Sequence, residues 1–216
     1  LEVGARRALD EVHTLKQCLD ATLAGHPPDD SLLWRRLAGV HEAFTLDREP
    51  LYELIEGAIW DLEDRPVESL DDLLAYSNLV GGSVGAMMLP FLTSDASARA
   101  ELEPPARSLG IAMQITNILR DVGEDVRQLD RVYLPHNWLR QRDLTREDLE
   151  EAPLPSSYPS LLETAMEAAE ARYRSSFAGI DALPLQARLG IRAAARMYRE
   201  IMNEVRALDY DNINHR

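Results

Sequence analysis

Apolar residues recur every three or four positions along almost the whole chain, and this spacing limits the folds that the sequence can adopt. A representative run consists of Leu51, Leu54, Ile55, Ala58, Ile59 and Leu62. Side chains at these intervals share one face of an α-helix, whereas the alternation typical of a half-buried strand is not sustained anywhere. The pattern therefore predicts an all-α protein.

Breaks in the periodicity mark the expected helix ends. Proline, glycine and aspartate gather at positions 26–30, 47–50, 65–66, 94–95, 104–105, 130–135 and 153–159. Such residues favour turns, and they divide the chain into about seven or eight helices. Ser69 with Asp72, and Thr145 with Asp148, have the spacing of helix-capping pairs. No repeat or shift in composition marks a boundary, so we expect residues 1–216 to form a single helical domain.

Charge and cysteine content exclude several classes of function. The 216 residues carry 23 Lys and Arg against 37 Asp and Glu, a formal net charge of −14. This charge repels phosphate backbones, so nucleic acid is not expected as a partner. Because Cys18 is the single cysteine, an internal disulfide framework and a cysteine-based zinc site are excluded. The five histidines lack metal-ligand spacing, and no Ser-His-Asp motif appears, which argues against zinc enzymes and triad hydrolases.

The longest apolar stretch, Val80 to Leu92, is interrupted by three glycines and a proline. The sequence therefore predicts no transmembrane helix. The chain opens at Leu1 without a basic segment followed by an apolar run, so we expect that either no signal peptide existed or the true start is missing. We expect a cytoplasmic protein.

A polar stripe follows the helix expected around residues 110–125. At about 100° per residue, Gln114, Asn117, Asp121 and Asp125 fall within about 80° of one another. The neighbouring core-facing stripe consists of Ile111, Ile115, Leu119 and Val122. A polar row beside an apolar one is typical of residues that line a cavity.

Asp121 and Asp125 lie one helical turn apart, with Cβ atoms roughly 6 Å from each other. Like charges at this spacing destabilise a helix, and Mg²⁺ would offset them while accepting diphosphate oxygens at its other positions. Asn117 and Gln114 would orient metal-bound water or substrate oxygens, and Arg120 would contact phosphate. Acidic pairs at this spacing are also common on solvated helix faces, so spacing alone leaves both interpretations open.

The wider string favours the first interpretation. It resembles the second aspartate-rich motif of the squalene/phytoene synthase family, approximately Q-x-x-N-I-x-R-D-x-x-E-D followed by R-x-Y-x-P. The matching positions are Gln114, Asn117, Ile118, Arg120, Asp121, Glu124, Asp125, Arg131, Tyr133 and Pro135. Further matches over essentially the whole chain include Gly57 with Asp61, Leu73 with Tyr76, Gly82 with Gly85, and Tyr198 with Ile201.

This resemblance implies an isoprenoid-synthase helical bundle around a central cavity. It also implies a Mg²⁺-assisted, head-to-head condensation of two prenyl diphosphates, with Mn²⁺ as an alternative metal. Asp121 and Asp125 would bind the metal, with support from Asn117. Arg131 and Tyr133 would meet diphosphate or the intermediate, and Tyr133 would join the two aspartates as a catalytic residue. No nucleotide cofactor is expected if the product is phytoene.

The small residues between Leu79 and Gly85 need a compensating reason, because glycine in a helix costs about 1 kcal/mol relative to alanine. Close helix packing would supply one, and space for an isoprenoid tail would supply another. The resemblance favours the tail, with Tyr76, Val80 and Gly85 facing the tail or the intermediate. By sequence alone Tyr198 is a core aromatic residue, whereas the resemblance points it into the cavity.

A cluster of acidic residues ends the helix expected before residue 65. It consists of Asp61, Glu63 and Asp64. We expect most of this cluster to be solvated, and only Asp61 matches a polar position of the family.

The family's first aspartate-rich motif has no counterpart in the sequence. We therefore expect that the chain is truncated at its N-terminus, which leaves open whether the given polypeptide is active. The preferred function is synthesis of phytoene from two geranylgeranyl diphosphates in carotenoid biosynthesis, because Arg131–Pro135 and Asp209–Asn212 resemble phytoene synthases. The alternatives are a squalene or dehydrosqualene synthase that uses two farnesyl diphosphates, and a catalytically inactive helical member.

The hydrocarbon nature of the expected product leads to an expectation about membranes. We expect weak, reversible peripheral contact through an apolar rim around the cavity mouth, because a C40 hydrocarbon should leave directly into lipid. A basic patch is not expected to contribute, since the net charge of −14 opposes anionic headgroups. The alternative is a cytoplasmic protein that meets the bilayer only through partner enzymes.

Overall fold

The computed structural model describes residues 2–150 and 153–214, and over these residues all regular structure is helical. The long helices are α1 (Glu2–Leu23), α2 (Leu32–Phe44), α3 (Arg48–Leu62), α7 (Ala96–Glu124), α9 (Tyr158–Ala182) and α10 (Leu185–Ala207). The shorter ones are α4 (Leu70–Ser77), α5 (Ser83–Met87), α6 (Leu89–Leu92) and α8 (His136–Arg140). Two π-helical turns, η1 (Asn78–Gly82) and η2 (Asp125–Leu129), and the 3-10 turn η3 (Glu147–Leu149) complete them. The all-α prediction is confirmed.

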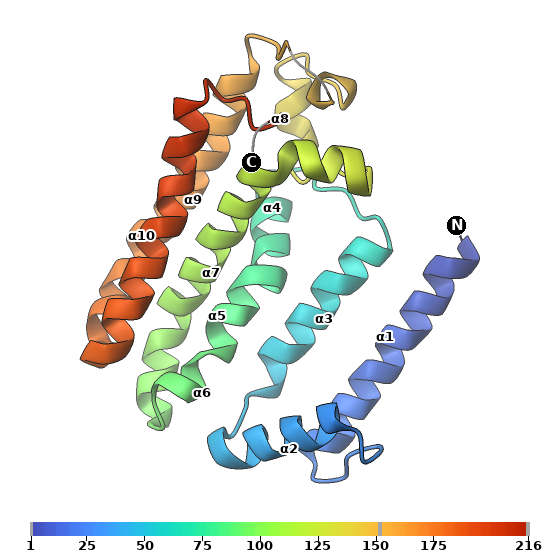
Figure 1. Ribbon diagram of the computed structural model, residues 1–216, viewed down its shortest axis with the longest axis vertical. Helices are drawn as coiled ribbons and strands as arrows, with labels where there is room; N and C mark the ends of the chain where they lie inside the picture. Colours follow the sequence, from blue (N-terminus) through green and yellow to red (C-terminus); the bar gives the residue numbers. More distant parts are fainter. Residues whose placement is uncertain (1, 151–152, 215–216) are drawn as a thin grey trace.

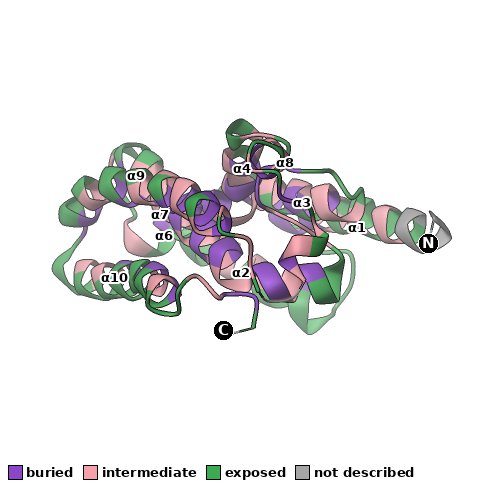
Figure 2. Ribbon diagram, turned by 90° about the horizontal axis from the view of Figure 1, so that it is seen from above, coloured by how far each residue is buried: buried purple, intermediate pink, exposed green. Residues whose placement is uncertain are grey.

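The long helices form an array with α7 near its centre (Figure 1). α9 and α10 lie toward one edge, and α3 and then α1 lie toward the other. α7 packs against α9, α10 and the broken helix α4–α6, while α1 packs against α2 and α3. Buried residues line the inward faces and exposed residues cover the outside when the array is viewed from above (Figure 2). α7 therefore carries residues into the middle of the molecule.

The largest cluster of buried side chains lies where α7 meets α9. Ile115 and Leu119 of α7 and Leu162 of α9 are fully buried. Each such side chain contributes about 1.5–3 kcal/mol relative to an exposed one. The hydroxyls of Thr116 and Tyr173 lie 3.0 Å apart within this cluster and satisfy each other. This packing fixes which face of α7 points away from the core.

Side-chain caps begin helices α3, α4 and α7. The Ser69 hydroxyl accepts from the Asp72 amide, and the Asp72 carboxylate accepts from the Ser69 amide at 2.9 Å, as the sequence predicts for α4. Asp95 accepts from the Ser97 amide at the start of α7. The other predicted pair, Thr145 and Asp148, is hydrogen bonded at 2.8 Å but leads into η3 rather than into an α-helix.

The predicted break at Pro104 and Pro105 is wrong, because α7 continues through both residues. Proline removes an intrahelical hydrogen bond and usually kinks or ends a helix. Here a Cβ atom on Gly179 of α9 would overlap the Pro105 ring, so the ring fits closely over a residue that has no side chain. Tertiary packing along α7 offsets the local cost of the prolines.

The glycine run packs backbone against backbone. A Cβ atom on Gly81 would overlap the carbonyl oxygen of Gly110, and one on Gly85 would overlap that of Ala106. Close helix packing is therefore a role of these glycines, although the resemblance favoured space for an isoprenoid tail. It lets η1 and α5 lie directly on α7.

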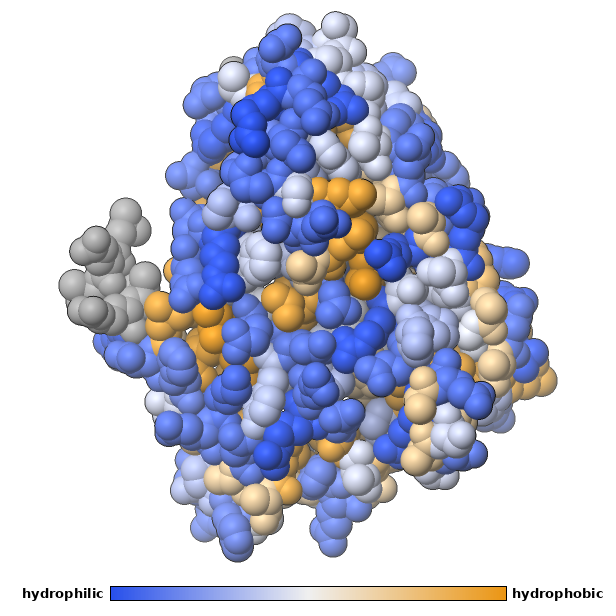
Figure 3. Space-filling model, turned by 180° about the vertical axis from the view of Figure 1, so that it is seen from behind, coloured by the Kyte–Doolittle hydropathy of each residue, from blue (hydrophilic) through white to orange (hydrophobic). Residues whose placement is uncertain are grey.

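The stretch Leu70–Leu92 is long and apolar enough to cross a membrane by length and composition alone. Its apolar window is 44% buried inside the protein. One such helix is weak evidence for a membrane span, because a buried core helix passes the same test. The back of the molecule is mostly hydrophilic, with hydrophobic side chains in patches between polar ones (Figure 3).

Candidate active site

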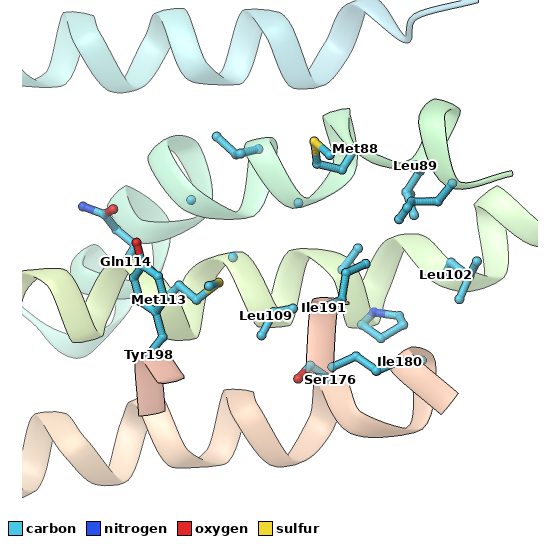
Figure 4. A pocket seen from close by; sticks show the side chains of 18 of the residues that line it. Met88, Leu89, Leu102, Leu109, Met113, Gln114, Ser176, Ile180, Ile191 and Tyr198 are labelled. Atoms are coloured by element: carbon cyan, nitrogen blue, oxygen red, sulfur yellow. The ribbon is translucent and has the colours of Figure 1, made fainter. Parts of the chain in front are cut away.

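An apolar cavity of about 400 Å³ lies between the broken helix α5–α6, α7, the end of α9 and the start of α10. This volume is in the range of small-molecule sites, about 300–1,000 Å³. Leu89 and Leu102 lie toward one end of the cavity, and Met113, Gln114 and Tyr198 lie toward the other (Figure 4). The cavity therefore has an apolar end and a more polar end.

Three polar side chains mark the polar end, namely Gln114, Asn117 and Tyr198. The Oδ1 atom of Asn117 is buried and has no hydrogen-bond partner in the part of the chain that the structure describes. An unsatisfied buried acceptor costs about 1–3 kcal/mol. A cation or a donor group bound at this end would satisfy it.

Asp121 and Asp125 follow Asn117 along the same side of α7. The Asp125 amide donates to the Asp121 carbonyl, so the two residues are one turn apart as expected. Both are partly buried, but neither lines the cavity itself. The sequence hypothesis placed all four stripe residues in one cavity, and the structure places Gln114 and Asn117 there, with the aspartates beyond them.

Negative charge is concentrated around Asp125. Burial, and after it the nearby charges of Asp121, Glu124 and Asp61, together raise the pKa of Asp125 to about 7. Asp61 belongs to α3, so α3 and α7 bring carboxylates to the same region. A divalent cation would offset this charge.

Arg120 pairs with its neighbour Asp121 instead of remaining open for a phosphate. Its Nε and Nη2 atoms donate to the two carboxylate oxygens of Asp121 at 2.7 and 2.5 Å. This bidentate bond raises the pKa of Arg120. The predicted phosphate contact by Arg120 therefore requires exchange of this partner.

Asp61 is the residue whose importance the sequence analysis underestimated. Its Oδ1 atom accepts from Arg131 Nη1 at 2.7 Å and from the Tyr133 hydroxyl at 3.0 Å. Its Oδ2 atom accepts from the Tyr76 hydroxyl at 3.1 Å. Arg131 also donates to Asp64, so its guanidinium is occupied by this acidic cluster.

Tyr76 does not line the cavity, whereas Val80 and Gly85 both do. Its ring stacks on Tyr133 with centroids 5.0 Å apart and contacts Trp60 at 5.8 Å. Burial raises the pKa of both tyrosine hydroxyls, so they donate rather than ionise. The resemblance implied that Tyr76 faces the tail or the intermediate, and its hydroxyl reaches the carboxylate end of the site.

The residues present fit Mg²⁺, although no preformed metal cage exists among the described residues. No group of three or more His, Cys, Asp and Glu side chains in residues 2–150 and 153–214 is arranged to hold a metal ion. Asp121, Asp125 and Asn117 offer oxygen donors only, the ligand type that Mg²⁺ prefers. Mg²⁺ commonly binds through one or two carboxylates together with substrate phosphates. The orphaned Asn117 oxygen fits this mode of binding.

Two π-helical turns meet the site, and the periodicity of the sequence did not reveal them. η1 supplies Val80 and Gly81 to the cavity, and η2 begins at Asp125. Such turns occur frequently at functional sites. They also account for part of the excess of helical segments over the seven or eight helices that the sequence predicts.

A family model described as Squalene/phytoene synthase matches residues 2–216. The chain belongs to this family. The phytoene synthase of Rhodobacter capsulatus is 37% identical over 223 residues, which cover 100% of this chain and 62% of the relative. Phytoene synthase 1, chloroplastic, of Arabidopsis thaliana is 34% identical over 201 residues, which cover 92% of this chain and 47% of the relative. The chain thus spans about half the length of several curated relatives of the squalene/phytoene synthase family.

Solved structures agree with this assignment to the squalene/phytoene synthase family. A dehydrosqualene synthase in complex with a ligand has a TM-score of 0.84 and 34% identity, over 94% of this chain and 71% of that one. A squalene synthase from Alicyclobacillus acidocaldarius has a TM-score of 0.83 at 19% identity, over 94% of this chain and 74% of that one, and it shows the fold alone. The expected helical bundle of the family is confirmed.

Proposed function

We propose that the protein is a head-to-head prenyltransferase that condenses two geranylgeranyl diphosphates to phytoene and releases diphosphate. The observation that carries this proposal is the division of α7 into two parts. From Leu102 to Met113 it lines the apolar part of the cavity, and from Gln114 onward, as far as Asp125 at the start of η2, the chain bears amides and carboxylates. A prenyl diphosphate has the same division, with an apolar tail and an anionic head.

The carboxylate end is the proposed site of ionisation. Mg²⁺ held by Asp121 and Asp125, with support from Asn117, would stabilise the negative charge of the departing diphosphate, and Mn²⁺ is the alternative ion. Arg131 and Tyr133 hold the Asp61 carboxylate beside this end through hydrogen bonds of 2.7 and 3.0 Å. These contacts keep a third carboxylate within electrostatic range of Asp125.

The cavity walls are the proposed protection for the carbocation that ionisation leaves behind. Water would quench such a cation as an alcohol, so the tail and the reacting carbons need a dry environment. Val80, Leu102 and Leu109 provide walls without nucleophilic groups. Tyr198 and Gln114 at the polar end would orient the substrate.

A squalene-type or dehydrosqualene-type synthase remains the second candidate. The phytoene synthase of Rhodobacter capsulatus is 37% identical, but a dehydrosqualene synthase structure at 34% identity is nearly as similar. The two candidates differ in the substrate, which is geranylgeranyl diphosphate for phytoene and farnesyl diphosphate for squalene or dehydrosqualene.

Product analysis by mass tests the proposal. The protein is incubated with Mg²⁺ and either geranylgeranyl or farnesyl diphosphate, and the hydrocarbon fraction is analysed. We expect a C40 product from geranylgeranyl diphosphate, which Asp125→Asn abolishes and Asp71→Asn, at an exposed position of α4, leaves unchanged. A product from farnesyl diphosphate alone would favour the second candidate. No product from either substrate would favour an inactive helical member of the family.

A further inference from the structure

The chain turns sharply after α10 and returns to the end of α7 (Figure 1). We call residues 208–214 the return segment. Asp209 and Tyr210 have left-handed backbone conformations, with φ of 52° and 64°, which residues with side chains rarely adopt in succession. The Tyr210 hydroxyl donates to Glu163 of α9 at 2.8 Å and fixes the turn. The fold therefore maintains an unfavourable turn in order to bring the return segment back onto α7.

Asn212 joins α7 to α9 within the return segment. Its side chain is buried, and its Nδ2 atom donates to the main-chain carbonyl of Leu119 on α7. Its Oδ1 atom accepts from the hydroxyl of Tyr158 on α9 at 2.7 Å, and the Tyr158 side chain is fully buried. A flipped amide would set its oxygen against the Leu119 carbonyl oxygen. The two bonds therefore determine how the amide is oriented.

The return segment also packs directly on Gly123 of α7. A Cβ atom on Gly123 would overlap the carbonyl oxygen of Ile213, whose side chain is buried. At about 100° per residue, the direction midway between Leu119 and Gly123 lies about 160° from that midway between Asp121 and Asp125. The return segment thus supports α7 from the side opposite to the two aspartates.

The carboxylate end of α7 is weak as an isolated helix. Its last turn contains Asp121, Gly123 and Glu124 and has no basic residue. Acidic groups near the C-terminal end of a helix oppose the helix dipole, and glycine is a poor helix former. Asp121 and Asp125 are like charges one turn apart, and at Asp125 the helix passes into the π turn η2. This end of α7 therefore needs support from outside the helix.

We propose that Asn212 is a positioning residue that holds the last turns of α7 so that Asp121 and Asp125 can bind Mg²⁺ and diphosphate together. The inference rests on the proposed function, because it concerns the same two carboxylates. Asn212 acts through the α7 backbone at Leu119 and is not itself a ligand. Loss of a residue that orients metal ligands typically lowers metal affinity about 10–100-fold.

Hydrogen exchange and calorimetry on the whole chain test the proposal without any need for turnover. Asn212→Leu removes both bonds. Asn212→Asp keeps the bond from Tyr158 but sets a carboxylate oxygen against the Leu119 carbonyl. In both variants we expect amide exchange in residues 119–129 to become about tenfold faster. Calorimetric binding of Mg²⁺ with inorganic diphosphate should weaken about tenfold.

The charge introduced by Asn212→Asp sharpens the test. An additional carboxylate would by itself attract the cation, so electrostatics alone predicts tighter binding of Mg²⁺. Weaker binding in this variant would therefore reflect displacement of the α7 carboxylates. Circular dichroism establishes that the helices are intact, and Tyr158→Phe, which removes only one hydroxyl, is a milder variant with the same expected direction of change.

Tyr173→Phe is the matched control for loss of a buried hydrogen bond. It removes the contact of 3.0 Å between Tyr173 and Thr116 of α7 but leaves the return segment intact. We expect exchange in residues 119–129 and diphosphate binding to change less than about twofold in this control. Gly123→Ala is an independent variant. Alanine favours a helix, so exchange should slow if the return segment has no role and accelerate if the methyl group displaces Ile213.

Three outcomes would overturn the proposal. Unchanged exchange and binding in both Asn212 variants would show that α7 does not need this support. Losses of equal size in Tyr173→Phe would reduce the role of Asn212 to general stability. The absence of Mg²⁺–diphosphate binding in the unmodified protein would overturn the proposal together with the proposed function. Only this last outcome involves the unmodified protein, so the two kinds of failure are distinguishable.

Discussion

The guanidinium of Arg131 donates to both the side chain and the main chain of Asp61, at 2.7 and 2.6 Å, although 70 positions separate the two residues. The Arg131 side chain is only 12% exposed. This pair ties the segment after η2 to the C-terminal end of α3. The arginine of the R-x-Y-x-P motif thus has a structural partner, whatever it contacts during a reaction.

Replacing Arg131 by methionine should lower the free energy of unfolding by about 1–3 kcal/mol, because three acceptors at Asp61 and Asp64 lose a charged donor. Urea unfolding monitored by circular dichroism measures this. Arg140→Met is the control, since its side chain is 64% exposed and its bond to Glu68 lies at the surface. We expect the control to change stability by less than about 1 kcal/mol. Equal losses in the two variants would contradict a structural role for the Arg131 pair.

Gly110→Ala should destabilise the protein by about 1–3 kcal/mol or more, because the new methyl group would overlap the backbone of Gly81 and force α7 away from η1. Thermal unfolding measures the effect. Gly39→Ala, in the exposed middle of α2 with nothing within 4 Å of the new methyl group, should stabilise by about 0.5–1 kcal/mol. The change in stability must have opposite signs in the two variants. A Gly110→Ala protein as stable as the unmodified one would refute the close contact between Gly110 and Gly81.

Asp121→Asn should reduce prenyl transfer on the order of 100-fold while the fold stays intact, since the substitution preserves volume and removes the charge that the cation needs. Turnover and calorimetric binding of Mg²⁺ with inorganic diphosphate are the measurements. Asp71→Asn removes one exposed carboxylate elsewhere and should leave both unchanged. Full activity in Asp121→Asn would rule out the metal role.

The bond between Glu163 of α9 and Arg206 of α10 makes stability depend on pH. Arg206 donates to both carboxylate oxygens at 2.7 and 2.8 Å and lowers the pKa of Glu163 below its ordinary value of 4.5, with a smaller contribution from Tyr210. A lowered pKa in the folded state stabilises the fold above pH 4.5, and this contribution is lost as the pH falls through the folded-state pKa.

Glu163→Gln should therefore lower the free energy of unfolding at pH 7 by less than about 1 kcal/mol, since the pair is about one-third exposed and partly screened. The difference from the unmodified protein should shrink toward zero in acid. Urea titrations across the acid range measure it. A difference that is constant with pH would show that the charge on Glu163 is not responsible.

Local patterns predicted much of the fold and part of the site. Helical periodicity gave the all-α class, and the spacing of Ser69 and Asp72 located the start of α4. The stripe on α7 depended only on residues close in sequence, so its geometry was predictable. The continuity of α7 through Pro105 was not, because contact with Gly179 on another helix overrides the local preference.

The contacts of Asp61 show why the rest of the site could not be predicted from the sequence. Its hydrogen-bond partners Tyr76, Arg131 and Tyr133 lie 15, 70 and 72 positions away. Spacing arguments apply within one helix and say nothing about side chains that meet only after α3, α4 and the segment after η2 have packed together. Only the charge of Asp61 and its match to a polar family position gave any signal.

The π-helical turn η1 has a geometric consequence for the two ends of the site. A π turn holds one residue more than an α turn, so side chains after it are rotated by about 100° relative to an uninterrupted helix. In a continuous α-helix, Tyr76 and Val84 would lie about 80° apart, and the extra residue in η1 reduces this angle to about 20°. Tyr76, which reaches the Asp61 carboxylate, and Val84, which lines the apolar cavity, therefore lie on one side of the broken helix. A shift in phase by one residue thus lets one side of a single stretch of chain serve two chemically opposite compartments.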